Sequence, residues 1–158
     1  MRLRRDLAYW LLVAGGLLWV GAALLAPYGR SRGWEAAPWL YAFFHPVCHQ
    51  LPDRSFACFG HPLAVCHRCL GLYLGFLAGL LAWPSLPRLG RRLLDRPRWV
   101  LAFFVPLGAD VALGASTAGS RFATGLVAAF PVALLLLAAA AQLTDRRHHP
   151  REETYVPR

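Results

Sequence analysis

The chain has 158 residues, of which 57% are hydrophobic, 13% aromatic and only 16% charged, whereas an average soluble protein has about 25% charged residues. The length fits one domain, and the composition argues against a soluble globule and for a membrane protein. The formal net charge is +9, and all 17 Lys and Arg positions are arginine. The arginines lie at the ends of apolar runs, so membrane topology explains them better than nucleic-acid binding does, and no nucleic-acid partner is expected.

Four apolar segments follow one another along the chain. A helix that spans the bilayer needs about 20 apolar residues, and these segments do not alternate apolar and polar residues as strands do. The predicted fold is therefore all-α: a four-helix transmembrane bundle in one domain, residues 1–145, followed by a polar cytoplasmic tail, residues 146–158. The predicted helices cover about residues 7–26, 63–83, 99–115 and 122–141.

The positions of the arginines predict the orientation of this bundle. Three arginines precede the first predicted helix, five lie between the second and third, and four follow the fourth, against five on the opposite side. Because positive residues accumulate on the cytoplasmic side, we expect a multi-pass protein of the inner (plasma) membrane with both termini in the cytoplasm. The long loop between helices 1 and 2 then faces outwards. A cleaved signal peptide is the alternative for the first segment, and it would leave this loop outside as well.

The outward loop contains most of the reactive side chains. Residues 45–69 read HPVCHQLPDRSFACFGHPLAVCHRC and include all four cysteines and four of the six histidines. Aromatic residues cluster just before this stretch, and such residues favour the membrane–water boundary. They predict a short interfacial helix near Pro38 to Phe44, with aromatic packing on the bundle as the alternative.

The second predicted helix has two different faces. Gly71, Gly75 and Gly79 recur every four residues, so they form a stripe on which a partner helix can pack closely. Cys66 and Cys69 lie on the other side of the helix, three residues apart and therefore on one face.

Asp110 in the third predicted helix is expected at the same depth as the two cysteines. At 1.5 Å per residue it lies about 8 Å inside the outer boundary. A carboxylate within a spanning segment needs a partner or water. The sequence offers Arg121, which precedes the fourth helix, or whatever the Cys/His residues bind.

The residues from position 45 to position 125 follow the pattern H-x-x-C-H-Q, R-S-F, G and C-x-R-C-x-G-x-Y-x-G, then an Asp and an Arg before T-G. This pattern resembles that of a family of small bacterial integral membrane proteins, the domain of unknown function 2085. The matching residues are His45, Cys48, His49, Gln50, Arg54, Ser55, Phe56, Gly60, Cys66, Arg68, Cys69, Gly71, Tyr73, Gly75, Asp110, Arg121, Thr124 and Gly125. The resemblance implies a membrane location and supplies no reaction. Cys58, His61 and His67 lie outside the pattern and are interpreted as bystanders.

Three functions remain open for the Cys/His residues. Thiolate and imidazole ligands suit Zn²⁺, and also copper or iron, so an outward-facing metal site is the leading hypothesis, with zinc favoured. The second is a membrane thiol–disulfide oxidoreductase that uses Cys66 and Cys69. The third is a structural or accessory subunit of a membrane complex, whose loop is held by disulfides such as Cys48–Cys58.

The metal hypothesis names a ligand set and the residues around it. The predicted ligands are His45, Cys48, His49, Cys66 and Cys69. The residues predicted to surround and orient them are Arg54, Tyr73, Asp110 and Arg121. If this set is correct, the sulfur atoms of the three cysteines should converge within about 4 Å with an imidazole nitrogen among them. No catalytic residue is assigned.

Overall fold

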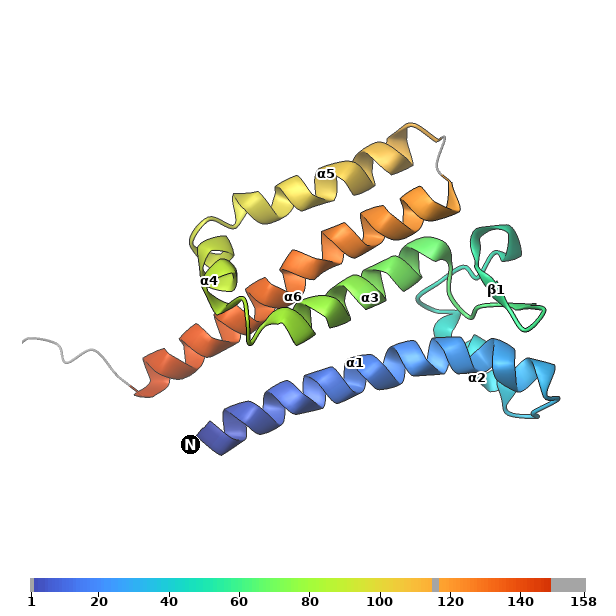
Figure 1. The fold of residues 1–158 in the computed structure, drawn as a ribbon, viewed down its shortest axis with the longest axis horizontal. Helices are drawn as coiled ribbons and strands as arrows, with labels where there is room; N and C mark the ends of the chain where they lie inside the picture. Colours follow the sequence, from blue (N-terminus) through green and yellow to red (C-terminus); the bar gives the residue numbers. More distant parts are fainter. Residues whose placement is uncertain (1, 115–116, 149–158) are drawn as a thin grey trace, which may run out of the picture.

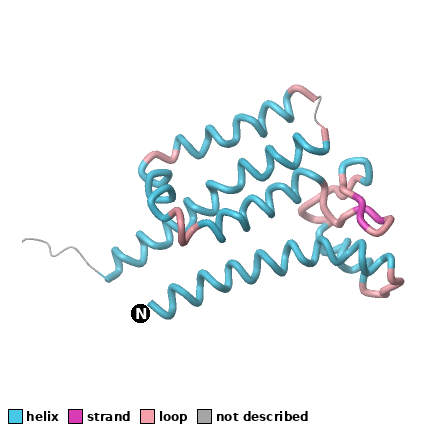
Figure 2. The backbone as a smooth tube through the Cα atoms, viewed as in Figure 1, coloured by secondary structure: helices cyan, strands magenta, loops and turns pink. Residues whose placement is uncertain are grey.

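The computed structural model describes residues 2–114 and 117–148, and it is built mainly of helices (Figure 1). The long helices are α1 (Arg2–Ser31), α3 (His67–Ala82), α5 (Arg98–Ala112) and α6 (Ala118–His148). The shorter elements are α2 (Ala37–Phe44), the 3-10 turn η1 (Pro52–Arg54), β1 (Ala57–Cys58), β2 (His61–Pro62) and α4 (Pro87–Asp95). The antiparallel hairpin β1–β2 lies in the loop region before α3 (Figure 2).

Among the described residues, two helices are long and apolar enough to cross a membrane, Leu7–Ser31 within α1 and Ala118–Thr144 within α6. The pair α3 and α4 passes the same test together, but it is bent by 114° at its break. The fold is thus a mostly helical one with two candidate spans, and four spanning helices are not confirmed. The physical reason is length: α3 has 16 residues and α5 has 15. They extend about 24 and 23 Å, less than the hydrocarbon core of about 30 Å.

The helices α1 and α6 extend beyond their predicted ends on both sides. Both helices are longer than the predicted ranges 7–26 and 122–141, and both contain a fully buried proline, Pro27 in α1 and Pro131 in α6. Proline is tolerated inside membrane helices, where neighbouring groups can satisfy the freed carbonyl. The first three residues of the predicted tail, 146–148, belong to α6, and the rest of that tail lies outside the described residues.

The helix α4 was not predicted, because its residues were interpreted as an arginine-rich connection. Pro87 occupies its first turn, where the missing N–H costs nothing and the fixed φ suits a helix. Gly90 and Leu93 are buried, and a Cβ at Gly90 would lie within 3.0 Å of the Leu134 carbonyl oxygen in α6. The helix therefore packs across α6 at the end where α3 stops and α5 begins (Figure 1).

The glycine stripe of α3 packs directly on α6. A Cβ at Gly71, Gly75 or Gly79 would lie less than 3.0 Å from atoms of α6, most of them backbone atoms. Gly125 of α6 is equally close to the carbonyl oxygen of Arg68, at 2.6 Å from an added Cβ. The partner helix of the stripe is thus a helix of the same chain, and the stripe is covered rather than open to a separate protein.

The region around α2 closes the end of the molecule at which α3 begins. The predicted short helix near residues 38–44 is present as α2, and Phe44 is fully buried. The indole of Trp19 in α1 lies edge-to-face against Phe43, Phe44 and Tyr73, with ring centroids 5.2 to 5.8 Å apart. These aromatic contacts hold α2 against α1 and α3.

The close approach of α3 to α6 generates the first prediction. Gly75→Ala should lower the free energy of unfolding by about 1–3 kcal/mol, because the new Cβ would collide with the Leu126 carbonyl and force the helices apart. Gly21→Ala is the matched control, since nothing lies within 4 Å of a Cβ at this exposed position of α1. It should be neutral or stabilising through helix propensity. Thermal unfolding in detergent measures both variants, and equal melting temperatures would contradict the packing.

Candidate metal centre

Three cysteine side chains meet where the loop returns to the helices. Cys48 follows α2, Cys66 immediately precedes α3, and Cys69 lies in the first turn of α3. Their sulfur atoms all lie within 4.8 Å of one another. Among the described residues, this is the one group of three or more His, Cys, Asp or Glu side chains whose donor atoms come this close. We call it the three-cysteine cluster.

The local backbone explains why the cluster forms. Cys66 is the N-cap of α3 and has extended geometry, with φ −74° and ψ 165°. Cys69 follows three residues later, so its side chain lies on the same face of the helix. The backbone N–H of Cys66 donates a hydrogen bond to the sulfur of Cys48 at 3.1 Å. One free donor at the start of α3 therefore fixes the loop cysteine beside the other two.

The loop that carries Cys48 is held by a glutamine. Gln50 has a positive φ of 52°, and its side-chain nitrogen donates to the carbonyl oxygens of Tyr41 and Ala64 at 2.7 and 2.8 Å. The Tyr41 hydroxyl in turn donates to the carbonyl oxygen of Pro62 at 2.6 Å. These bonds connect α2 to the segment that leads into α3. Gln50 belongs to the sequence motif, but the sequence alone predicts no role for it, because its hydrogen-bond partners are backbone atoms.

Burial and hydrogen bonds set the state of the thiols. Cys48 is 4% exposed, and Cys66 and Cys69 are intermediate. A hydrogen bond from the Cys69 side chain, together with those from the Cys69 and Arg68 N–H groups and the Cys48 thiol, outweighs the effect of burial and lowers the pKa of Cys66 to about 5. The same hydrogen bond and burial raise the pKa of Cys69, so Cys66 is the member of this pair that favours the thiolate, the form that binds metals and attacks disulfides.

The cluster opens into a cavity of about 350 Å³. Its lining includes all three cysteines, His49, and the arginines Arg54, Arg68 and Arg121. The three arginines come from η1, α3 and α6 respectively. Positive charge beside the sulfur atoms favours thiolates over neutral thiols. Two residues predicted to surround the site, Arg54 and Arg121, thus line the same cavity as the cysteines.

Asp110 has a partner that the sequence interpretation did not consider. Arg68 donates from Nη2 to Oδ2 of Asp110 at 2.6 Å, and the Ser120 hydroxyl donates to Oδ1 at 2.6 Å. The side chains of Arg68 and Asp110 are 30% and 7% exposed. The carboxylate is therefore satisfied, as expected for a carboxylate on a membrane helix. This pair links α5 to α3 next to the cluster.

The structure does not place an imidazole in the three-cysteine cluster. His49 is exposed and lines the cavity, whereas His45 caps the C-terminal end of α2, is exposed and does not line it. The three sulfur atoms thus lie within 4.8 Å of one another, without a histidine nitrogen in the group. Ligation by His45 or His49 stays a prediction.

Cys58, His67 and Tyr73 do not belong to the three-cysteine cluster. Cys58 is exposed in β1, and all four cysteines are free thiols. His67 is 5% exposed, and its ring lies against Phe56 with centroids 4.3 Å apart. Tyr73 is partly buried against the core that contains Cys48, so it contacts the surroundings of the site, and a role for it in the site's chemistry stays a prediction.

Comparison with known proteins identifies the family. The family model described as "Predicted membrane protein (DUF2085)" matches residues 48–135. The chain belongs to this family. An uncharacterised protein of Methanocaldococcus jannaschii is 32% identical over 140 residues, which is 82% of this chain and 90% of that protein. An uncharacterised protein of Methanothermobacter thermautotrophicus is 50% identical over 32 residues, 20% of this chain and 29% of its own length. No solved structure matches the chain.

The comparison confirms the predicted membership of the domain of unknown function 2085 family and its description as a membrane protein. The Methanocaldococcus relative is archaeal, so the expectation of a bacterial family is not confirmed. The matched range begins at Cys48 and extends past Arg121. It therefore contains all three cysteines of the cluster and the ion pair beside them.

The second prediction concerns this ion pair. Arg68→Gln and Asp110→Asn should each lower the melting temperature, because each leaves a charged group without its partner in a mostly buried position. The double variant should recover part of the loss, since neither charge then remains. Glu35→Gln, at an exposed carboxylate, is the control and should change nothing. Strictly additive losses in the double variant would show that the two side chains do not depend on each other.

Proposed function

We propose that this protein is an integral membrane metal-binding protein whose ion is held by Cys48, Cys66 and Cys69. The observation that carries this proposal is the convergence of the three sulfur atoms within 4.8 Å. Zinc binds thiolate sulfur at about 2.3 Å, so two sulfurs of a tetrahedral site lie about 3.8 Å apart. The separation of the three sulfur atoms is therefore of the size that one bound ion requires.

The charges around the cluster support an ion bound by thiolates. Three thiolates and one divalent cation carry a net charge of −1, which would be costly in a half-buried site without compensation. Arg54 and Arg121 supply positive charge from the cavity wall, beside Arg68, whose charge is balanced by Asp110. A set of three thiolates favours zinc, and also copper(I) or iron, over magnesium or calcium, which prefer oxygen ligands.

The fourth ligand distinguishes two kinds of site. Four protein ligands are typical of structural zinc sites, and three with an open position are typical of catalytic ones. His49 is the histidine better placed to complete the set, because it lines the cavity with the cysteines and His45 does not. Without His49, the fourth position would face the cavity and its arginines, where water or an anionic molecule could enter.

We further propose that α1, α3, α5 and α6 all cross the membrane, with both termini in the cytoplasm and the cluster on the outer side of the plasma membrane. Figure 1 supports this arrangement, because the N-terminus of α1 and the helix α4 lie at one end of the molecule and α2 and the hairpin at the other. The arginine-rich first turn of α1 and the arginines of α4 thus share one end. That end would be cytoplasmic by the distribution of positive charge.

The third prediction tests the metal. Protein purified after expression in zinc-supplemented medium should contain about one equivalent of metal per chain by elemental analysis. Cys48→Ser, Cys66→Ser and Cys69→Ser should each weaken zinc binding by more than about 100-fold, because each removes a side chain that binds the ion directly. Cys58→Ser is the matched control, since this thiol is exposed and outside the cluster, and it should retain the metal.

Other outcomes of this measurement also decide between the hypotheses. If His49 is the fourth ligand, His49→Ala should weaken binding while His45→Ala should not. A protein that binds no metal and forms a reversible disulfide between Cys66 and Cys69 would contradict the metal proposal and favour a thiol–disulfide oxidoreductase. Equal loss of metal in the Cys58→Ser variant would contradict the assignment of the ligands.

The fourth prediction tests the orientation with the exposed thiol of Cys58. In a variant with serine at the three cluster positions, a membrane-impermeant maleimide should label Cys58 in intact cells. The control adds Cys58→Ser and Arg88→Cys, which moves the single thiol to an exposed position of α4. This thiol should react only after the membrane is permeabilised. Labelling of Cys58 only after permeabilisation would reverse the proposed orientation.

A further inference from the structure

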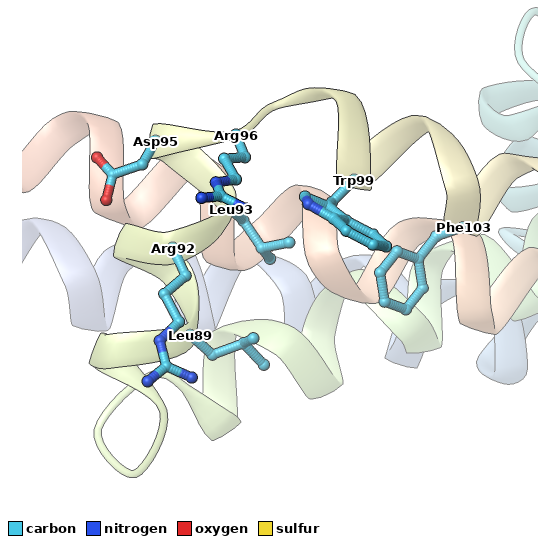
Figure 3. Close-up of a pocket in the computed structure, with 7 residues that line it drawn as sticks. All are labelled: Leu89, Arg92, Leu93, Asp95, Arg96, Trp99 and Phe103. Atoms are coloured by element: carbon cyan, nitrogen blue, oxygen red, sulfur yellow. The ribbon is translucent and has the colours of Figure 1, made fainter.

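A groove of about 560 Å³ lies between α4 and the first turns of α5, at the opposite end of the molecule from the cysteines (Figures 1 and 3). Seven residues line it: Leu89, Arg92, Leu93, Asp95, Arg96, Trp99 and Phe103. We propose that this groove binds one anionic phospholipid, with the phosphate at Arg92 and Arg96 and an acyl chain on the apolar side chains. This inference does not depend on the metal site.

The apolar half of the groove is open although it consists of large side chains. Trp99 is 55% exposed, Leu89 is 39% exposed and Phe103 is 38% exposed. In Figure 3 the rings of Trp99 and Phe103 lie beside each other on successive turns of α5, and Leu93 points toward them from α4. Such a surface is costly in water and is suited to an acyl chain.

The basic half lies along α4 and its C-terminal end. Arg92 and Arg96 are exposed, and neither makes a side-chain hydrogen bond or an ion pair within residues 2–114 and 117–148. In Figure 3 their guanidinium groups lie on the side of the groove away from Phe103, and the Asp95 carboxylate points away from both aromatic rings. Two guanidinium groups without a hydrogen bond or ion pair in the described residues therefore line this half of the groove, and a guanidinium group can bind two phosphate oxygens at once.

The position of the groove favours a lipid over a soluble anion. α4 turns away from α3 by 114° at the end of the molecule where the candidate span of α1 starts, at Leu7. A basic amphipathic helix at the end of spanning helices lies at the level of the headgroups. Basic residues at this level, with Trp beside them, bind anionic headgroups. Separate basic and apolar halves match the two parts of a phospholipid and have no counterpart in inorganic phosphate.

The test compares two double variants that remove the same charge from α4 and the residue that caps its C-terminal end. Arg92→Gln with Arg96→Gln changes the groove, whereas Arg88→Gln with Arg91→Gln changes exposed arginines that do not line it. Binding of phosphatidylglycerol and of phosphatidylcholine with identical acyl chains is measured by native mass spectrometry of the full chain in detergent. Wild type should bind phosphatidylglycerol more tightly, the groove variant should bind it about tenfold or more weakly, and the control variant should match wild type.

A second measurement, of tryptophan fluorescence, tests whether an acyl chain lies on the apolar half of the groove. Phosphatidylglycerol with brominated acyl chains should quench part of the tryptophan fluorescence of wild type, and Trp99→Phe should lose that part. If both double variants bind phosphatidylglycerol equally weakly, the lipid is attracted by the overall positive charge and the proposed site in the groove is wrong. Equal binding of the two lipids by wild type, or displacement of the lipid by millimolar inorganic phosphate, would overturn the proposal as well. Circular dichroism of each variant shows that it is folded.

Discussion

The close contact between α3 and α6 is the constraint on which the rest of the structure depends. Gly71, Gly75 and Gly79 let the backbones of the two helices meet, and a stripe used in this way fixes the rotation of α3 about its axis. Once that rotation is fixed, the thiols of Cys66 and Cys69 lie on the face turned away from the stripe, so they meet the loop that follows α2. The cluster is therefore a consequence of how α3 packs on α6.

The same packing of α3 on α6 determines the positions of the charged side chains. Arg68 lies between the two cysteines of α3, and its backbone carbonyl is packed against Gly125 of α6. Its side chain reaches Asp110 on α5 at 2.6 Å. This pair fixes a short and largely exposed helix to the end of α3 that carries the thiols. Arg68 both neutralises Asp110 and lines the cavity of the thiols. The packing of α5 and the electrostatics of the cavity are therefore coupled through this one residue.

Local patterns in the sequence predicted the helical fold, the glycine stripe, the shared face of Cys66 and Cys69, and the short helix before the motif. Each depends on spacings of three or four residues, which helix geometry converts directly into position. The sequence did not predict the Arg68–Asp110 pair, whose members are 42 residues apart, because it exists only after α3 and α5 are packed. It also missed α4, whose apolar positions are hidden among arginines. The contribution of His45 and His49 could not be deduced either, since a loop has no period that fixes the direction of a side chain.

The loop around the cluster is held mainly by groups that are not metal ligands. Gln50 and the Tyr41 hydroxyl bind backbone carbonyls, and Phe44 is fully buried beside Trp19. The sulfur of the loop cysteine, Cys48, accepts a hydrogen bond from the backbone N–H of Cys66, and a serine oxygen can accept this bond as well. Replacing a cysteine of the cluster with serine should therefore leave the loop in place. In protein metal sites, hydrogen bonds from residues that are not ligands orient the ligands. In this loop, the residues that hold the backbone in place are therefore different from the three thiols that would bind the ion.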